Sequence, residues 1–158
     1  MPPSEGERAP DFTALLCDGE TFQTASLSTV CDGGCVVVFY GFSFSAIDEN
    51  WWKRYERAGW NEFEIPVVGV SREGPYAQNA FIRYLDSPFR LFSDGEGAAA
   101  EAYDLLTRRS GMGETRTARR AVFVLDDDRR VVHRWLGEDW ISPVPRAEIE
   151  AAVAELTG

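Results

Sequence analysis

The stretch CVVVFYGFSFSAIDENWW (Cys35–Trp52) passes from an apolar run directly into a segment with helical spacing. Its first part, CVVVFYGF (Cys35–Phe42), is continuous and rich in β-branched and aromatic residues, which indicates a strand buried on both faces of a sheet. Apolar side chains then recur at helical spacing over residues 46–58, and Gly59 ends the pattern. A buried strand followed by an amphipathic helix is typical of α/β proteins.

The rest of the chain continues this alternation of strands and helices. Crossovers long enough for parallel pairing, together with a hairpin at residues 121–135, predict a mixed central sheet flanked by helices in a single domain, residues 1–158. Further strands are expected around Asp18-Gly19, at 65–71 and at 89–93; further helices at 75–85, 97–106 and 143–156; and connections at 26–34 and 108–120.

The balance of acidic and basic residues indicates which partners the protein is expected to bind and what kind of organism it comes from. There are 26 acidic and 16 basic residues, giving a formal net charge of −10, and Lys53 is the only lysine. A nucleic-acid partner is not expected, because a polyanion demands a concentrated basic surface. A strongly negative, lysine-poor chain fits a protein kept soluble at high salt, so a halophilic source is our hypothesis.

Targeting signals are not visible in the sequence. The opening MPPSEGERAP lacks an apolar run and a cleavage signature, and no stretch approaches the roughly 20 apolar residues of a membrane span. We therefore expect a soluble, cytoplasmic protein without a membrane partner.

The three cysteines, Cys17, Cys31 and Cys35, all lie in the first quarter of the chain. A turn at Asp-Gly-Gly could bring Cys31 and Cys35 to the Cα separation of about 5.5 Å that a disulfide prefers. They are either a redox-active pair or two small apolar residues that bracket a turn. Because His133 is the only histidine, no zinc site is expected, and the sequence predicts no metal and no cofactor.

Ser45 and Asp48 stand at the start of the predicted helix in the capping-box pattern, in which a hydroxyl residue is followed three positions later by an acid. A helix cap is therefore the simplest role for Asp48. Its place after a buried strand, where many α/β proteins hold a reactive group, also makes it a candidate site residue.

Four segments in the same order resemble the peroxiredoxins, the alkyl hydroperoxide reductase and thiol-specific antioxidant branch of the thioredoxin-like fold. The resemblance covers nearly the whole chain and implies a thioredoxin-like mixed sheet and thiol-dependent peroxidase activity. The segments are GERAPDFTALLCDGETFQTASL, the stretch FYGFSFSAID, SPFRLFSDGEGAAAEAYDL and RRAVFVLDDDRRVVHRW.

The family's active-site pattern, Phe-Tyr-Pro-x-x-x-Thr-x-x-Cys, is altered in this chain. In this register Tyr40 is kept, Gly41 replaces the proline, Ser45 replaces the threonine, and Asp48 replaces the peroxidatic cysteine. Arg120 falls at the arginine that flanks the thiolate in the family. No other register supplies a thiol, because no cysteine follows Cys35.

The resemblance implies a peroxidase pocket without its nucleophile, because a carboxylate lacks the reversibly oxidised sulfur. Asp48 and Arg120 are then expected to pair in a retained site for peroxide or a small anion, or as a mimic of the sulfinate state. An engineered Cys-to-Asp change would give the same sequence. The alternatives are thiol chemistry at Cys31/Cys35 or Cys17, and a structural subunit beside an active relative; a homodimer is also implied by the resemblance.

Overall fold

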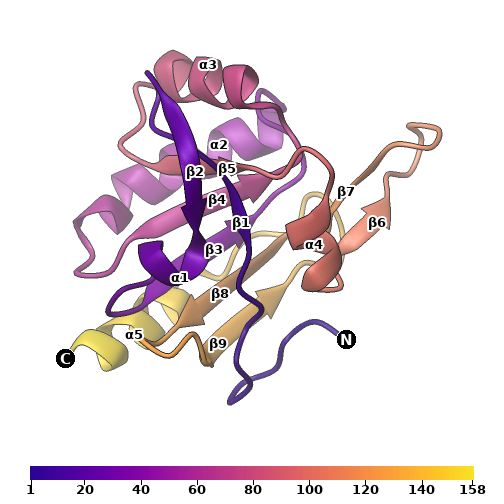
Figure 1. Ribbon diagram of the computed structural model, residues 1–158. Helices are drawn as coiled ribbons and strands as arrows, with labels where there is room; N and C mark the ends of the chain where they lie inside the picture. Colours follow the sequence, from indigo (N-terminus) through magenta and orange to yellow (C-terminus); the bar gives the residue numbers. More distant parts are fainter.

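The computed structural model describes residues 1–158 and shows a seven-stranded mixed sheet with helices on both faces (Figure 1). The strands lie in the order β2-β1-β5-β4-β3-β8-β9. This confirms the α/β architecture expected from the sequence. The strands of this sheet are β1 (Thr13–Cys17), β2 (Phe22–Ser26), β3 (Cys35–Phe39), β4 (Val67–Ser71), β5 (Arg90–Ser93), β8 (Ala121–Leu125) and β9 (Val131–Leu136).

Strand β3 lies inside the sheet, parallel to β4 and antiparallel to β8. All five of its residues are buried, as are all five of β4 and of β8. These strands are continuous apolar runs because both of their faces are covered by other elements. The end of β3 therefore leads the chain out of the core at Tyr40 and into the predicted site.

The helices divide between the two faces of the sheet. α2 (Ala46–Arg57), α3 (Pro75–Leu85) and α5 (Arg146–Thr157) cover one face and contribute to one buried apolar cluster. The short helices α1 (Leu27–Val30) and α4 (Ala98–Ala102) pack on the other face in a second cluster. Side chains alternate along β3, so Val36, Val38 and Tyr40 enter the first cluster, whereas Val37 and Phe39 enter the second.

Several elements differ from the sequence expectation. Residues 108–120, expected as a loop, contain most of a two-stranded hairpin made by β6 (Leu106–Arg108) and β7 (Arg116–Ala118), which projects beside α4 in Figure 1. The connection at 26–34 holds α1, and α4 is shorter than expected. A 3-10 turn, η1 (Trp60–Glu62), follows α2. Short polar segments with several glycines carry too weak a periodicity to reveal such elements.

Trp52 is buried in the core beneath the site. It stands off the apolar face of α2 that Trp51 and Tyr55 form in a simple helical projection, yet it is 2% exposed. Gly69 in β4 makes this packing feasible, because a Cβ at Gly69 would lie 2.5 Å from Trp52 Cζ2. The tryptophan is therefore part of the core beneath the site rather than part of an exposed aromatic cluster.

No helix is long and apolar enough to cross a membrane.

Candidate functional site

The candidate site lies where β3 ends and α2 begins. Ser45 is the N-cap of α2, with extended backbone angles, and its Oγ accepts a hydrogen bond of 3.3 Å from the Asp48 backbone N–H. This is the cap expected from the sequence, and it satisfies one of the free N–H groups of the first helical turn. Asp48 is only 3% exposed, so its carboxylate faces the interior rather than solvent.

The Asp48 carboxylate does not complete the capping box in the expected way. Oδ2 accepts hydrogen bonds from the Ser45 hydroxyl at 2.9 Å and from the Phe42 backbone N–H at 3.1 Å, and not from the Ser45 backbone N–H. Oδ1 receives no protein hydrogen bond. The carboxylate therefore reaches past the N-cap to hold the preceding loop, which is more than a helix cap requires.

The ionisation of Asp48 reflects a balance between burial and local donors. Burial raises the pKa of Asp48 above its ordinary value of 3.8, while the Phe42 N–H, the Ser45 hydroxyl and the charges of Arg120 and Arg109 oppose that rise. Desolvation is the largest of these effects. The site thus holds a carboxyl group whose charge is disfavoured by its surroundings.

Arg120 comes close to Asp48 but does not form the expected pair. The two side chains line the same cavity of about 10 Å³, roughly the room that one water molecule needs. No ion pair within 4.0 Å joins them, and Arg120 Nη1 instead donates to the Ser142 carbonyl at 2.7 Å. The expectation of a direct Asp48–Arg120 hydrogen bond is therefore corrected: the interaction is a longer-range one between charges.

Arg109 is a site residue that sequence reasoning missed. Its guanidinium stacks 3.6 Å from the Trp140 ring centroid and 5.0 Å from that of Phe42. Its Nη1 is buried and has no hydrogen-bond partner. A Cβ at Gly41 would lie closer than 3.0 Å to this nitrogen and 3.7 Å from Asp48 Oδ2. The glycine therefore provides the space in which Arg109 lies beside Asp48.

No local sequence pattern predicts this role for Arg109. It lies next to β6 in a segment with the features of a loop, and only the folding of the hairpin carries it to the end of β3. The one available signal was Gly41, since a residue without a side chain beside a site permits close approach of another group. Burial lowers the pKa of Arg109, while the charge of Asp48 raises it.

Tyr40 lines the cavity beside Asp48 and Arg120, and its hydroxyl enters a buried hydrogen-bond network. Its hydroxyl lies 2.9 Å from Ser43 Oγ and 3.0 Å from Gln78 Oε1, and Ser43 Oγ donates to the same Oε1 at 2.7 Å. Gln78 Nε2 then donates to Ser71 Oγ and to the Phe92 carbonyl. This network anchors the loop after β3 to α3, β4 and β5, and burial raises the pKa of the Tyr40 hydroxyl.

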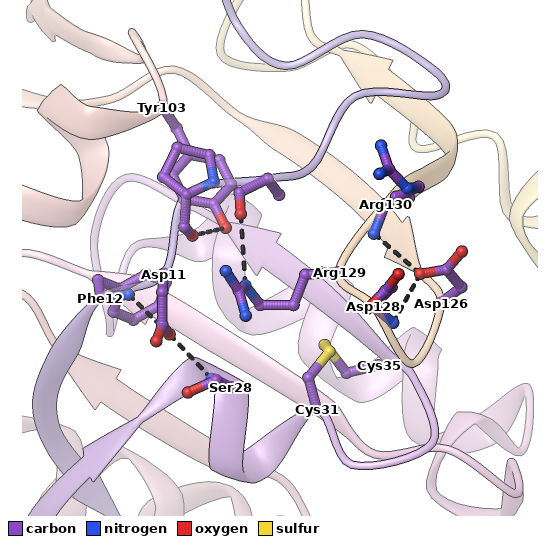
Figure 2. The surroundings of a disulfide bond; sticks show 12 residues. Asp11, Phe12, Ser28, Cys31, Cys35, Tyr103, Asp126, Asp128, Arg129 and Arg130 are labelled. Carbon is purple, nitrogen blue, oxygen red and sulfur yellow. Dashed lines mark hydrogen bonds between the residues drawn. A yellow bond between two sulfur atoms is a disulfide. The ribbon is translucent and has the colours of Figure 1, made fainter.

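Cys31 and Cys35 form a disulfide at the other end of β3, as Figure 2 shows. Their Cα atoms are 4.9 Å apart, and the residues are 1% and 0% exposed. The bond joins the residue after α1 to the first residue of β3 across the Asp-Gly-Gly turn. Of the two roles left open by the sequence, the structure therefore shows a covalent pair rather than two separate apolar side chains.

The remaining potential ligands and thiols do not assemble into a second reactive centre. Cys17 is a free, fully buried thiol, and burial raises its pKa to about 11. His133 lies in β9, 3.7 Å from Glu5. No group of three or more His, Cys, Asp or Glu side chains is placed to hold a metal ion.

Comparison with known proteins agrees with this fold. The model of the AhpC/TSA family matches residues 6–134. Peroxiredoxin Bcp of Bacillus subtilis is 27% identical over 137 residues, which cover 82% of this chain and 83% of the relative.

Solved structures match over almost the whole chain. Peroxidoxin BcpB from Mycobacterium tuberculosis has a TM-score of 0.79 at 22% identity, covering 98% of this chain and 97% of that chain. The reduced 2-Cys peroxiredoxin of Plasmodium vivax has a TM-score of 0.82 at 18% identity, covering 99% of this chain and 83% of that chain. At these identities the likeness establishes the thioredoxin-like fold expected from the sequence.

Proposed function

This chain belongs to the AhpC/TSA family, and we propose that it is a peroxiredoxin relative without the thiol peroxidase cycle, serving as a binding or regulatory protein. The observation that carries the proposal is Asp48. Its carboxylate occupies the first turn of α2, where the family resemblance places the peroxidatic thiol, and no cysteine follows Cys35 to replace it.

The chemistry of the cycle explains why this replacement matters. A thiolate sulfur gives two electrons to the peroxide O–O bond, takes one oxygen as a sulfenic acid and releases water or an alcohol. One thiol then condenses with the sulfenic acid to form a mixed disulfide and water, and a second thiol releases the nucleophile and leaves as a disulfide with the first. A carboxylate shares the negative charge and the position at a helix N-terminus, but it has no sulfur to pass through these oxidation states.

A regulatory or binding role fits what remains of the pocket. Ser45, Asp48, Arg109 and Arg120 keep a polar, charged centre at the end of a buried strand. We propose that Asp48, Ser45 and Arg120 define this altered site, with Tyr40 and Gly41 shaping its floor and entrance. A carboxylate held there also resembles an over-oxidised cysteine in charge, so a permanent mimic of the sulfinate state is consistent with the same geometry.

A second candidate is an antioxidant oxidoreductase that uses the Cys31–Cys35 disulfide, and the existence of that bond favours it. A dithiol can reduce hydrogen peroxide to two waters and close to the disulfide, which an external thiol then reopens. The burial of both cysteines opposes it, because exchange requires access to sulfur. Alkylation of the protein with and without prior reduction, read by mass spectrometry, measures that access; cysteines that stay unlabelled under native reducing conditions would remove this candidate.

A homodimer or a complex with an active relative is a further proposal. Phe44 and Tyr84 lie beside the start of α2, 48% and 62% exposed, with ring centroids 5.6 Å apart. Exposed paired aromatics are typical of contact surfaces. Sedimentation of the purified protein distinguishes a dimer from a monomer, and co-purification with a cysteine-bearing relative supports the mixed complex.

The test of the main proposal is Asp48→Cys, with Asp48→Ser as the matched control. We expect the cysteine variant to consume hydrogen peroxide in the presence of a thiol reductant, and we expect the wild type and the serine variant to remain at the background rate. If the cysteine variant stays silent, Asp48→Cys with Arg109→Ala tests whether Arg109 blocks the entrance. Peroxide consumption by the wild-type protein at peroxiredoxin-like rates would refute the proposal.

A further inference from the structure

Arg120 is a buried cation that makes no direct ion pair: the charges of Asp48 and Asp139 act on it from beyond 4.0 Å, and its guanidinium lies 5.4 Å from the Trp135 ring centroid. It is 4% exposed, and no carboxylate lies within 4.0 Å of its guanidinium. Its one hydrogen bond runs from Nη1 to the Ser142 carbonyl, so Nε and Nη2 have no protein acceptor. A charge removed from water is costly unless it is paired, so this arrangement indicates a missing partner.

Arg120 lines an open cleft of about 180 Å³ between the β6–β7 hairpin and the loop after β9, and it also lines the inner cavity beside Asp48. Arg119 and Arg108 also line the cleft. Arg119 uses only Nε, which donates to the Gly137 carbonyl at 2.7 Å, and its two terminal nitrogens are free. Arg108 is exposed and paired with Glu114. Two guanidinium groups with unused donors therefore converge on one cavity.

The carboxylates around the cleft form no direct ion pair with Arg120. Asp139 lines the cleft, but its Oδ1 accepts from the backbone and hydroxyl of Ser142, and this hydroxyl hydrogen bond is the main reason that the pKa of Asp139 is lowered. Glu138 is exposed to solvent and makes no ion pair. Asp48 lies behind Arg120 in the inner cavity, beyond ion-pair distance.

Trp140 holds a further arginine, Arg109, on this side of the molecule. Its ring lines the cleft and also stacks on the guanidinium of Arg109. Arg109 is therefore held between the altered site and the cleft, where its charge adds to those of Arg119 and Arg120. Glu138 and Asp139 line the same cleft, so an anion there is held by directed hydrogen-bond donors rather than by a wholly positive surface.

We propose that this cleft binds a small oxyanion, a carboxylate or a phosphate, with Arg120 donating from its floor and Arg119 from its rim. Planar guanidinium groups present paired donors that match both classes of anion. The cleft is smaller than the roughly 300 Å³ or more of pockets for drug-sized ligands, which restricts the occupant to a few heavy atoms. The proposal deepens the binding role given above and rests on it.

Isothermal titration with inorganic phosphate and, separately, with sodium formate tests the cleft, with chloride used to keep the ionic strength constant. We expect wild-type protein to bind at least one of them, and the tighter one identifies the class of anion. Arg119→Ala and Arg120→Met should each weaken binding about tenfold or more, since each removes a charge-assisted hydrogen bond. Arg120→Met keeps an unbranched apolar stem in place of the arginine stem, and Arg119→Ala gives an independent test if the former folds poorly.

Arg116→Ala is the matched control. It removes an exposed arginine from β7, in the same hairpin, whose side chain does not line the cleft. We expect its affinity to equal that of the wild type. If the wild type binds neither anion, the proposed anion site is wrong. An equal loss of affinity in all three variants would also contradict it, because it would indicate a general effect of charge. This outcome is separate from peroxide consumption: an active wild type that binds the anion would refute only the absence of the peroxidase cycle.

Discussion

The two ends of strand β3 carry contrasting chemistry. At the end that leads into α2, where the family keeps its reactive sulfur, the chain has the carboxylate of Asp48 among arginines. At the other end, roughly 13 Å away along the strand, Cys31 and Cys35 are joined in a buried disulfide. The sulfur atoms therefore form a cross-link at the start of β3, and a carboxyl group occupies the position after β3 where a reactive thiol is expected.

The contrast shows that the scaffold and the reactive group can change separately. The helix cap, the buried strand and the Tyr40–Ser43–Gln78 network hold the loop after β3, and the Asp48 carboxylate adds only its hydrogen bonds from Phe42 and Ser45. The fold therefore places whichever side chain stands at position 48. What that side chain can do is decided by its own chemistry and by its immediate neighbours Arg109 and Arg120.

Removal of the disulfide should have the largest effect on stability. Cys31→Ala with Cys35→Ala opens a loop of five residues, and chain-entropy arguments assign such a loop about 2 kcal/mol. We expect the free energy of unfolding in urea to fall by about this amount, with anion binding at the cleft unchanged. Cys17→Ala is the control for loss of a buried sulfur without loss of a cross-link. An unchanged free energy of unfolding in the double variant would remove the structural role of the bond.

A change at Gly41 should have a smaller effect at the opposite end of the strand. Gly41→Ala places a methyl group where Arg109 Nη1 lies, so the guanidinium must leave Asp48. Overpacking of this kind costs about 1 kcal/mol when the displaced group is a flexible side chain. In a protein that already carries Arg109→Ala, the same Gly41→Ala change should cost little stability, because the overlap is then gone.

Gly95→Ala is the control for this experiment, since a Cβ there would meet no atom within 4 Å. Equal losses of stability in Gly41→Ala and Gly95→Ala would show that the close approach of Arg109 has no energetic importance. Near-ultraviolet circular dichroism follows the movement of Arg109 from the Trp140 ring independently of stability.

The pH dependence of stability should be the smallest of these effects. The folded-state pKa of Asp48 is raised above the ordinary value of 3.8, so the folded protein holds this proton more tightly than the unfolded chain does. The stabilisation is complete below the unfolded value and is lost as the pH rises through the raised pKa. Relative to Asp48→Asn, the wild type should therefore lose stability as the pH rises above the ordinary value of 3.8 and through the raised pKa.

Urea unfolding of both proteins across this range measures the difference. Glu73 and Asp94 also have raised pKa values, but they are present in both proteins and cancel. A difference that stays constant with pH, or that changes in the opposite direction, would contradict the burial of the Asp48 charge.

The sequence was sufficient for the elements whose patterns are strong and local. The apolar run of β3, the helical spacing of α2 and the Ser45 cap follow from short-range periodicity and hydrogen bonding, and the structure confirms them. The disulfide was one of two options, because the spacing of Cys31 and Cys35 permits the bond without requiring it.

The parts that could not be predicted depend on contacts between distant segments. The β6–β7 hairpin is short and polar, so its pattern does not differ from that of a loop. Arg109 enters the site only because this hairpin folds toward β3 and because Gly41 has no side chain. The longer separation of Asp48 and Arg120 has the same origin, since the Ser142 carbonyl competes for the guanidinium. The halophilic source remains a prediction.

The central claim is that neither end of β3 reduces peroxide. The direct test is the rate of hydrogen peroxide consumption by wild-type protein with a thiol reductant, measured beside the Cys31→Ser/Cys35→Ser variant. We predict that both proteins remain at the rate of the reductant alone, because Asp48 lacks sulfur and the disulfide is buried. Rapid consumption by the wild type that disappears in the double variant would contradict the account and place the chemistry at the disulfide.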